Sequence, residues 1–152
     1  MLFRSEAVLS HVFEDWRPDG GVIPRRSNGV LVSDRAGNAM PYALFGLLDR
    51  GQFFVPPTTP VYEGMIVGEN NKDDDLTVNV CREKKLSNMR AAGRDENVKL
   101  PPPVVMSLEE CLEYVEDDEL LEVTPTQLRL RKRFLTELER KRDAKRSQAA
   151  GS

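Results

Sequence analysis

The chain has 152 residues, of which 39% are hydrophobic and 31% charged, and its formal net charge is −3 at pH 7. This length suits one domain with a fragment of a second. No stretch approaches the ~18 apolar residues that cross a bilayer, so the composition argues against a membrane protein. Cys81, Cys111 and the single histidine are too few soft ligands for a structural zinc site, so we expect free thiols in a reducing compartment.

The beginning of the chain differs from the rest. Residues 6–16 have a loose apolar pattern that fits a helix or a strand, and Asp19, Gly20 and Gly21 interrupt it. Because so short a segment cannot bury both of its faces alone, we expect it to be the remnant of a preceding domain. The opening Met1 to Ser5 has no secretory-signal core and matches a translated sequencing adapter, which suggests an artefactual start.

The pattern then favours strands. Apolar runs bounded by turn residues predict strands at 29–33, 52–55, 62–68 and 76–80. The run 42–48 is apolar on both faces and fits either a buried strand or a short buried helix, which periodicity cannot distinguish.

The segment 82–99 combines low hydrophobicity with six basic residues against three acidic ones. Loops of this length are uncommon unless they are functional or disordered. Its cations suit phosphate, its Ser and Asn side chains suit sugars or bases, and Gly93 permits close backbone approach. The RNA-binding candidates in this loop, for which a solvated loop is the alternative, are Lys84, Lys85, Ser87, Asn88, Arg90 and Arg94.

Ser107 opens the clearest helix. Ser107 and Glu110 predict a capping box, in which each side chain satisfies an orphan backbone N–H of the first turn. Apolar residues at helical spacing then predict one stripe facing the core: Leu108, Cys111, Leu112 and Val115. Eight acidic residues and no basic one lie between positions 109 and 122, and surface charge explains them better than an acid–base pair.

A hairpin follows, with strands predicted at 120–123 and 127–133. Alternation puts the leucines of the second strand on one face and its arginines on the other. The cations of this strand are the second RNA-binding candidate, against the alternative of a solvated surface: Arg129, Arg131, Lys132 and Arg133.

The residues from 136 onward are polar around their circumference and predict a frayed helix or a tail. Positions 129–146 hold nine basic residues against three acidic ones, a local net of +6. A polyanion-binding face can coexist with an acidic total, because the field of a charge decays over ~8–10 Å.

Two short matches to guanine-nucleotide motifs are weak. Asn71–Asp74 fits NKxD and Asp34–Gly37 fits DxxG, but the sequence has no GxxxxGK[ST] phosphate cradle. His11 is the only histidine, and no serine or cysteine near it completes a nucleophilic set. We therefore predict that this chain is not an enzyme and holds no metal or cofactor of its own.

Several blocks, taken together and in order, resemble the C-terminal region of the TypA/BipA translational GTPases over about residues 10–135. The blocks are Asn28–Ser33, Tyr42–Phe45, Asp49–Gly51, Val61–Gly68, Asp75–Asn79, Lys85–Ala91, Asp118–Pro125 and Arg129–Arg133. The sequence departs from the family's common pattern at Ser27, Asn38, Pro41 and Asn70. The segments 96–100 and 106–110 look slightly more like plastid members than bacterial ones.

The resemblance implies a role at the ribosome. Its family members combine a GTPase domain, a β-barrel and two α/β domains with a C-terminal domain peculiar to the family. GTP and magnesium would belong to the missing N-terminal domain. The implied partners are the large ribosomal subunit, its rRNA and the acceptor end of A-site tRNA, which the loop 84–94 would approach. The resemblance also implies functions in large-subunit assembly and in stress adaptation.

We therefore predict a β-rich α+β fold, with a small β-barrel or sheet, one amphipathic helix and a long basic loop. Residues 1–24 would be the remnant of an elongation-factor-like α/β domain, 25–135 the C-terminal domain, and 136–152 a polar tail. We expect a ribosome-associated monomer in the bacterial cytoplasm or the chloroplast stroma. The alternative is a free-standing protein-interaction module that binds through its acidic helix and ignores RNA.

Overall fold

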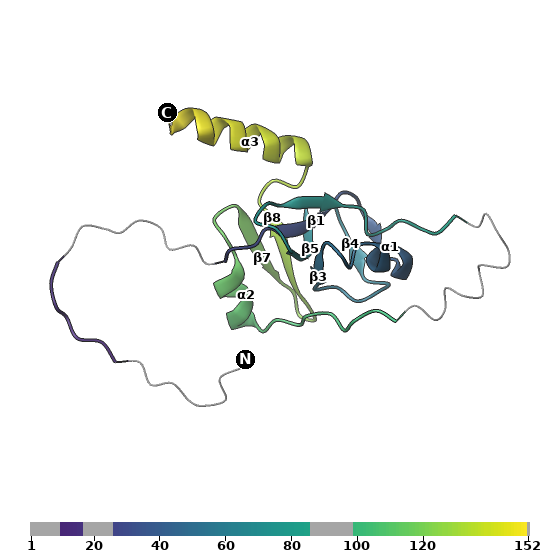
Figure 1. Ribbon diagram of the computed structural model, residues 1–152, viewed down its shortest axis with the longest axis horizontal. Coiled ribbons are helices and arrows are strands. Elements are labelled where there is room, and N and C mark those ends of the chain that lie inside the picture. The colour runs from purple at the N-terminus through teal and green to yellow at the C-terminus, as the bar shows by residue number, and fades with distance from the viewer. Residues whose placement is uncertain (1–9, 17–25, 86–98, 152) are drawn as a thin grey trace.

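Figure 1 shows the computed structural model of the chain, which describes residues 10–16, 26–85 and 99–151. The described part is an α+β domain rich in strands, as predicted. Its elements are β1 (Val30–Ser33), β2 (Gly37–Asn38), α1 (Pro41–Gly46), β3 (Gly51–Phe53), β4 (Pro60–Val61), β5 (Met65–Asn70), β6 (Leu76–Val78), α2 (Leu108–Tyr114), β7 (Glu119–Val123), β8 (Leu128–Lys132) and α3 (Glu137–Ala150).

Six strands form one sheet in the order β6-β1-β5-β8-β7, with β3 also paired to β5. The central strand β5 pairs antiparallel with β1, β3 and β8, whereas β1 and β6 run parallel. The short strands β2 and β4 form a separate pair. The sequence left open a small barrel or a sheet, and the described strands form an open sheet that does not close into a barrel.

Apolar cores lie on both faces of this sheet, so the central strand β5 is buried on both of its sides. Met65 and Val67 point to one face, where the larger core includes Leu44 of α1. Ile66 points to the other face, where a smaller core includes Cys111 of α2. The first three residues of β5, Met65 to Val67, are therefore a continuous apolar run rather than an alternation of apolar and polar residues.

The two-sided apolar run at 42–48 forms the helix α1 rather than a strand. Pro41 lies in its first turn, where its missing N–H breaks no hydrogen bond and its fixed φ suits a helix. Ala43 and Leu44 face the core, whereas Tyr42 and Phe45 are 41% and 52% exposed. Of the two alternatives, the short helix holds, but only one of its faces is buried.

The capping box of α2 is confirmed. The Glu110 N–H donates to Ser107 Oγ at 3.2 Å, and the Ser107 N–H donates to Oε2 of Glu110 at 2.7 Å. The predicted apolar stripe is only partly right. Cys111 is buried, but Leu108 and Leu112 are 41% and 57% exposed, because the helix rests on the sheet by a narrower edge than its spacing implied.

The predicted hairpin is also confirmed as β7 and β8, with Leu121 opposite Leu130. It inserts β8 beside β5, so the C-terminal part of the chain completes the sheet begun by β1. Gly64, just before β5, has a φ of +88°, and a Cβ there would lie 2.6 Å from the Cα of Leu135. Only glycine permits this crossing.

The helix α3 stands apart from the sheet (Figure 1), and none of its residues is buried. Thr136 and Glu139 give it a capping box of its own. Its charged surface fits the prediction of a polar segment. Among the described helices, none is long and apolar enough to cross a membrane.

Two predicted features fall mostly outside the described residues. Of the segment expected to be a domain remnant, residues 10–16 are described and have no regular secondary structure. Of the predicted basic loop, the structure describes only residues 82–85 and 99, which lie outside helices and strands.

Candidate nucleic-acid interface

The structure describes part of the predicted RNA-binding set. Lys84 is half-buried and Lys85 is exposed, at the start of the basic segment that follows β6. Four further candidates of that segment lie outside the described residues: Ser87, Asn88, Arg90 and Arg94. The described part of the candidate interface therefore consists of Lys84 and Lys85, at the start of the basic segment, and of the cations of β8.

The strand β8 separates its leucines from its arginines, as alternation predicted. Leu130 is buried, whereas Arg129 and Arg131 are half-buried on the opposite face. Arg133 follows the strand directly and is exposed. The three arginines therefore share one side of the strand, and their partners decide how much charge each one offers.

Arg129 and Arg131 have different partners. Nε and Nη2 of Arg129 donate to Oε1 of Gln127, at 3.1 and 2.9 Å, and this amide is neutral. Nε of Arg131 instead lies 2.8 Å from Oε1 of Glu122, whose charge opposes its own. The pair formed by Arg129 and Gln127 thus keeps a net positive charge, whereas the pair formed by Arg131 and Glu122 is neutral.

Glu122 is held in place from a second side. The hydroxyl of Tyr62 donates to Oε2 of Glu122 at 2.7 Å. Burial, and then the adjacent carboxylate, raise the pKa of Tyr62, so this hydroxyl remains a donor at neutral pH. Arg133 has a looser contact, 3.5 Å from Asp143, and both side chains are exposed enough for water to weaken the pair.

Lys132 corrects the predicted cationic stripe. Its side chain is 2% exposed and lies on the face opposite the arginines. Nζ is 2.5 Å from Oδ2 of Asp75, and 2.8 Å from Oδ2 of Asp118 and from Oε1 of Glu119. Three carboxylates therefore surround its ammonium group, and Lys132 offers no surface to RNA in this structure.

Arg26 completes an ion cluster whose members are Arg26, Asp75, Asp118, Glu119 and Lys132. We call it the buried ion cluster after its centre, Glu119 and Lys132, whereas Asp75 and Asp118 at its rim are 40% and 51% exposed. The guanidinium of Arg26 binds both carboxylate oxygens of Glu119, with Nη1 donating to Oε2 at 2.7 Å. It also lies over the ring of Tyr114, 4.6 Å from the centroid. The Glu119 side chain is fully buried between Arg26 and Lys132.

The charged state of this cluster follows from its contacts. Burial by itself would raise the pKa of Glu119, but hydrogen bonds from Arg26 and Lys132 outweigh it and hold that pKa below its ordinary value. Burial would likewise lower the pKa of Lys132, but its carboxylate partners raise it above the ordinary value. Glu119 and Lys132 are therefore both ionised at neutral pH.

Three carboxylates in and beside this cluster have the spacing of a possible metal site. Carboxylate oxygens of Glu116, Asp118 and Glu119 lie within 4.8 Å of one another. Two of these carboxylates already bind the Lys132 ammonium, which supplies the positive charge that a metal ion would bring. These acidic residues are accounted for by the protein's own cations.

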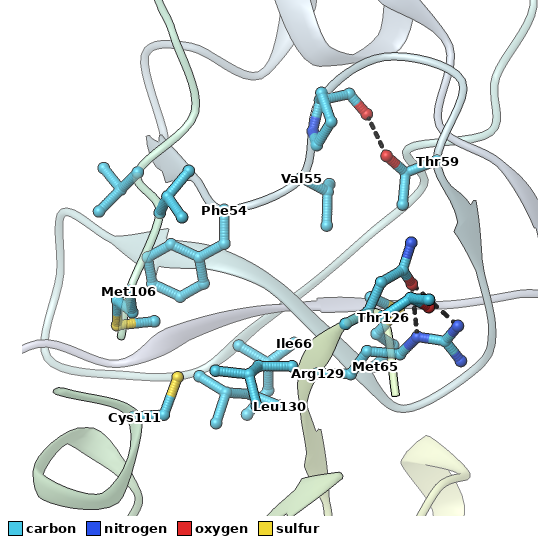
Figure 2. Close-up of a pocket in the computed structure, with 15 residues that line it drawn as sticks. Phe54, Val55, Thr59, Met65, Ile66, Met106, Cys111, Thr126, Arg129 and Leu130 are labelled. Atoms are coloured by element: carbon cyan, nitrogen blue, oxygen red, sulfur yellow. Dashed lines mark hydrogen bonds between the residues drawn. The ribbon is translucent and has the colours of Figure 1, made fainter. Parts of the chain in front are cut away.

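A hollow of about 350 Å³ lies beside Arg129. Figure 2 shows Phe54, Met106 and Cys111 on one side of it and Arg129 on the other. Neither a histidine nor a carboxylate lines it, and burial raises the pKa of the Cys111 thiol. The lining offers apolar contact with one cation at the rim.

The two short motif matches lie mostly in bends of the chain, and Gly37 of the DxxG match begins β2. In the DxxG match, Asp34 is engaged by Arg35, with Nη2 2.8 Å from Oδ2. In the NKxD match, Nδ2 of Asn71 donates to the backbone oxygen of Asp49 at 3.1 Å. Each match thus has a local structural role.

The fold and this surface define a small α+β domain with surface arginines on one strand and a buried ion cluster beneath. The family model of the TypA/BipA C-terminal domain matches residues 28–137. The chain therefore belongs to the TypA/BipA family and carries its C-terminal domain.

Curated relatives support the same assignment. The chain is 53% identical over 136 residues to the large ribosomal subunit assembly factor BipA of Salmonella typhimurium, covering 90% of this chain and 22% of the relative. It is 46% identical over 151 residues to the protein of that name in Bacillus subtilis, covering 99% of this chain and 25% of the relative. The chain thus spans about a quarter of the length of these relatives.

Sequence reasoning missed the ion cluster. Glu119 and Lys132 come from β7 and β8, Asp75 directly precedes β6, and no spacing in the sequence brings the three together. One signal was present: in β8, Lys132 falls in register with the buried Leu130 rather than with the arginines. Alternation therefore could have assigned Lys132 to the interior.

Proposed function

We propose that this domain binds RNA of the large ribosomal subunit, as the C-terminal part of a TypA/BipA-type protein that acts in assembly of that subunit. The observation that carries the proposal is the family match together with relatives named as large ribosomal subunit assembly factors. The described cations supply a physical basis, since RNA binding depends first on contacts to phosphate.

The proposed contacts have two parts. Arg129 and Arg133 would bind phosphates from one side of β8, and Lys84 and Lys85 would do so from the root of the basic segment. The remaining candidates of that segment keep the roles that the resemblance implies, including an approach to the acceptor end of A-site tRNA. Because each phosphate contact releases counterions, affinity should fall steeply as salt rises.

The activities of the whole protein are a further part of the proposal. GTP binding and hydrolysis, with magnesium, would belong to the portion of the relatives that this chain does not span. We place the protein, as a monomer, on ribosomes of the bacterial cytoplasm or the chloroplast stroma, with a role in growth under stress.

Co-sedimentation of the purified chain with large ribosomal subunits, at low and moderate salt, tests this proposal. Two variants remove cations from the proposed contacts: the triple reversal of Lys84, Lys85 and Arg90 to Glu, and Arg129→Glu. Lys141→Glu is the control, because this exposed side chain on α3 pairs with Glu137 at 2.6 Å and lies outside the proposed contacts.

We expect salt-sensitive binding that the triple reversal abolishes and Arg129→Glu weakens, with the control variant unchanged. Circular dichroism should show the same fold for all of these proteins. If the chain fails to sediment with subunits at low salt, and a chain extended by the upstream domains fails as well, the proposal is wrong.

One observation favours the alternative function, in which the domain binds another protein rather than RNA. On the acidic helix α2, Leu108 and Leu112 are exposed, although the helix packs on the sheet through Cys111 and Tyr114. An apolar strip of this kind can bind another protein surface. Association with subunits that is indifferent to salt, and lost in Leu112→Ser, would support this alternative.

A further inference from the structure

The helix α1 presents two aromatic rings to solvent. Tyr42 and Phe45 lie three positions apart, which places them on the same side of a helix. They are 41% and 52% exposed, while Ala43 and Leu44 between them are buried. The helix is therefore already anchored by its inner face, and the fold itself does not require aromatic rings on the outer one.

These rings form one wall of a hollow of about 460 Å³, a size found in sites that hold small ligands. The opposite wall is the strand β6 with Asn79 after it. Among the described strands, β6 pairs only with β1, so its other edge borders the hollow. Unpaired backbone groups of an edge strand can hydrogen-bond a ligand.

Cations surround the hollow. Arg50 and Arg82 line it, and both are exposed. Arg140 of α3 approaches the same strand, with Nη2 3.4 Å from Oγ1 of Thr77. Asp49 lies 3.9 Å from Nε of Arg50, but it is largely exposed to water and offsets only part of this charge.

This combination suits an unpaired nucleotide. Bases released from a helix stack on aromatic side chains and arginines, and their edges bond to polar groups. An extended peptide could also use the edge of β6, but it would not need two arginines beside two exposed rings. Arg82 also opens the basic segment, so the hollow lies at the root of the surface proposed to bind RNA.

We propose that the hollow between α1 and β6 binds an unpaired nucleotide of RNA. Its base stacks on Tyr42 and Phe45, and the adjoining phosphates contact Arg50 and Arg82. This inference rests on the proposed RNA-binding function and adds a preference to it: the domain recognises single-stranded RNA at this position.

The test compares the full chain on two probes, a single-stranded RNA of about ten nucleotides and a duplex of the same length. Fluorescence anisotropy measures both affinities. The double variant Tyr42→Leu/Phe45→Leu keeps apolar side chains on α1, so circular dichroism should show an unchanged fold. Phe13→Leu is the matched control, because Phe13 is also an exposed aromatic residue and lies outside the hollow.

We expect the double variant to bind single-stranded RNA about tenfold more weakly, with duplex affinity and the control unchanged. Ultraviolet crosslinking of the single strand should mark the tryptic peptide 36–50. If wild-type chain binds both RNAs and the double variant matches it, this inference is wrong while the proposed function stands. If wild-type chain binds neither RNA, the proposed function fails first. Crosslinks to a protein partner in place of RNA would identify a peptide site and overturn the inference.

Discussion

The carboxylate of Glu119 lies between the guanidinium of Arg26 and the ammonium of Lys132, with its side chain fully buried. Arg26 and Glu119 are 93 positions apart in the sequence. Their contact joins the segment that enters the domain to the hairpin that completes the sheet. Both charges of this pair are satisfied, so the removal of one partner should cost far more than the pair contributes by itself.

Lys132→Gln should therefore destabilise the domain by about 3–5 kcal/mol, because it removes one of the two cations that pair with the fully buried carboxylate of Glu119. Arg129→Gln removes a cation from the same strand, where its partner is a neutral amide. That change should alter the free energy of unfolding by no more than about 0.5 kcal/mol. Urea denaturation followed by circular dichroism measures both values, and equal stabilities would contradict the buried cluster.

The free energy of unfolding should decrease at both acid and alkaline pH. The pKa of Glu119 is lower in the folded state than its ordinary value of 4.5, so its contribution is present above that value and is lost as pH falls through the folded pKa. The pKa of Lys132 is raised above 10.5, so its contribution is present below that value and is lost as pH rises through the folded pKa.

Unfolding free energies measured from acid to alkaline pH should thus form a plateau that falls at both ends. Glu119→Gln should flatten the acid limb relative to the wild-type chain, in addition to lowering the plateau. An acid limb of the same steepness in this variant would show that other carboxylates produce it.

Substitution of Gly64 or Gly46 by alanine compares a glycine that the backbone requires with one that it does not. Gly64→Ala should destabilise the domain by about 2 kcal/mol or more, because its φ is +88° and the new Cβ would lie 2.6 Å from the Cα of Leu135. Gly46→Ala meets no atom within 4 Å and should be neutral or stabilising by about 0.4–1 kcal/mol. Thermal unfolding distinguishes the two, and similar melting temperatures would contradict the close crossing at Gly64.

The two capping boxes provide another comparison. Ser107→Ala should cost about 1 kcal/mol of global stability, because α2 packs on the sheet through Cys111. Thr136→Ala removes the equivalent cap from α3, which buries no residue. It should lower helix content while leaving the urea midpoint unchanged. A shifted midpoint for Thr136→Ala would mean that α3 contributes to the core.

Local signals in the sequence accounted for much of the fold. The capping box at Ser107 and the hairpin of β7 and β8 depend on residues close together in the chain, and both are present. The exposure of Leu108 and Leu112 could not be predicted, because it depends on how deeply α2 settles on the sheet. The choice of helix for 42–48 was open because the run is apolar on both faces.

The candidate site was harder to predict from the sequence than the fold. Composition could mark cations on β8, but it could not separate Arg129 from Arg131, since their partners arrive through the hairpin turn and the neighbouring strand. The hollow beside α1 unites residues from separate elements, and the exposure of Tyr42 and Phe45 appears only once the inner face of the helix is filled. The partners of these arginines and the exposure of these aromatic rings depend on packing between residues that are distant in the sequence.

The position of β8 beside β5 also bears on how the chain is made. Met65 of β5 lies opposite Arg131 of β8, so the central strand acquires this neighbour only after more than sixty further residues have been synthesised. Until then its edge carries unpaired backbone groups, and the carboxylates of Asp75 and Glu119 lack the ammonium group of Lys132, although Arg26 can already pair with Glu119. A polypeptide interrupted before β8 would thus display an unpaired strand edge beside exposed apolar residues of the core, and such surfaces make incomplete chains prone to aggregation and dependent on chaperones.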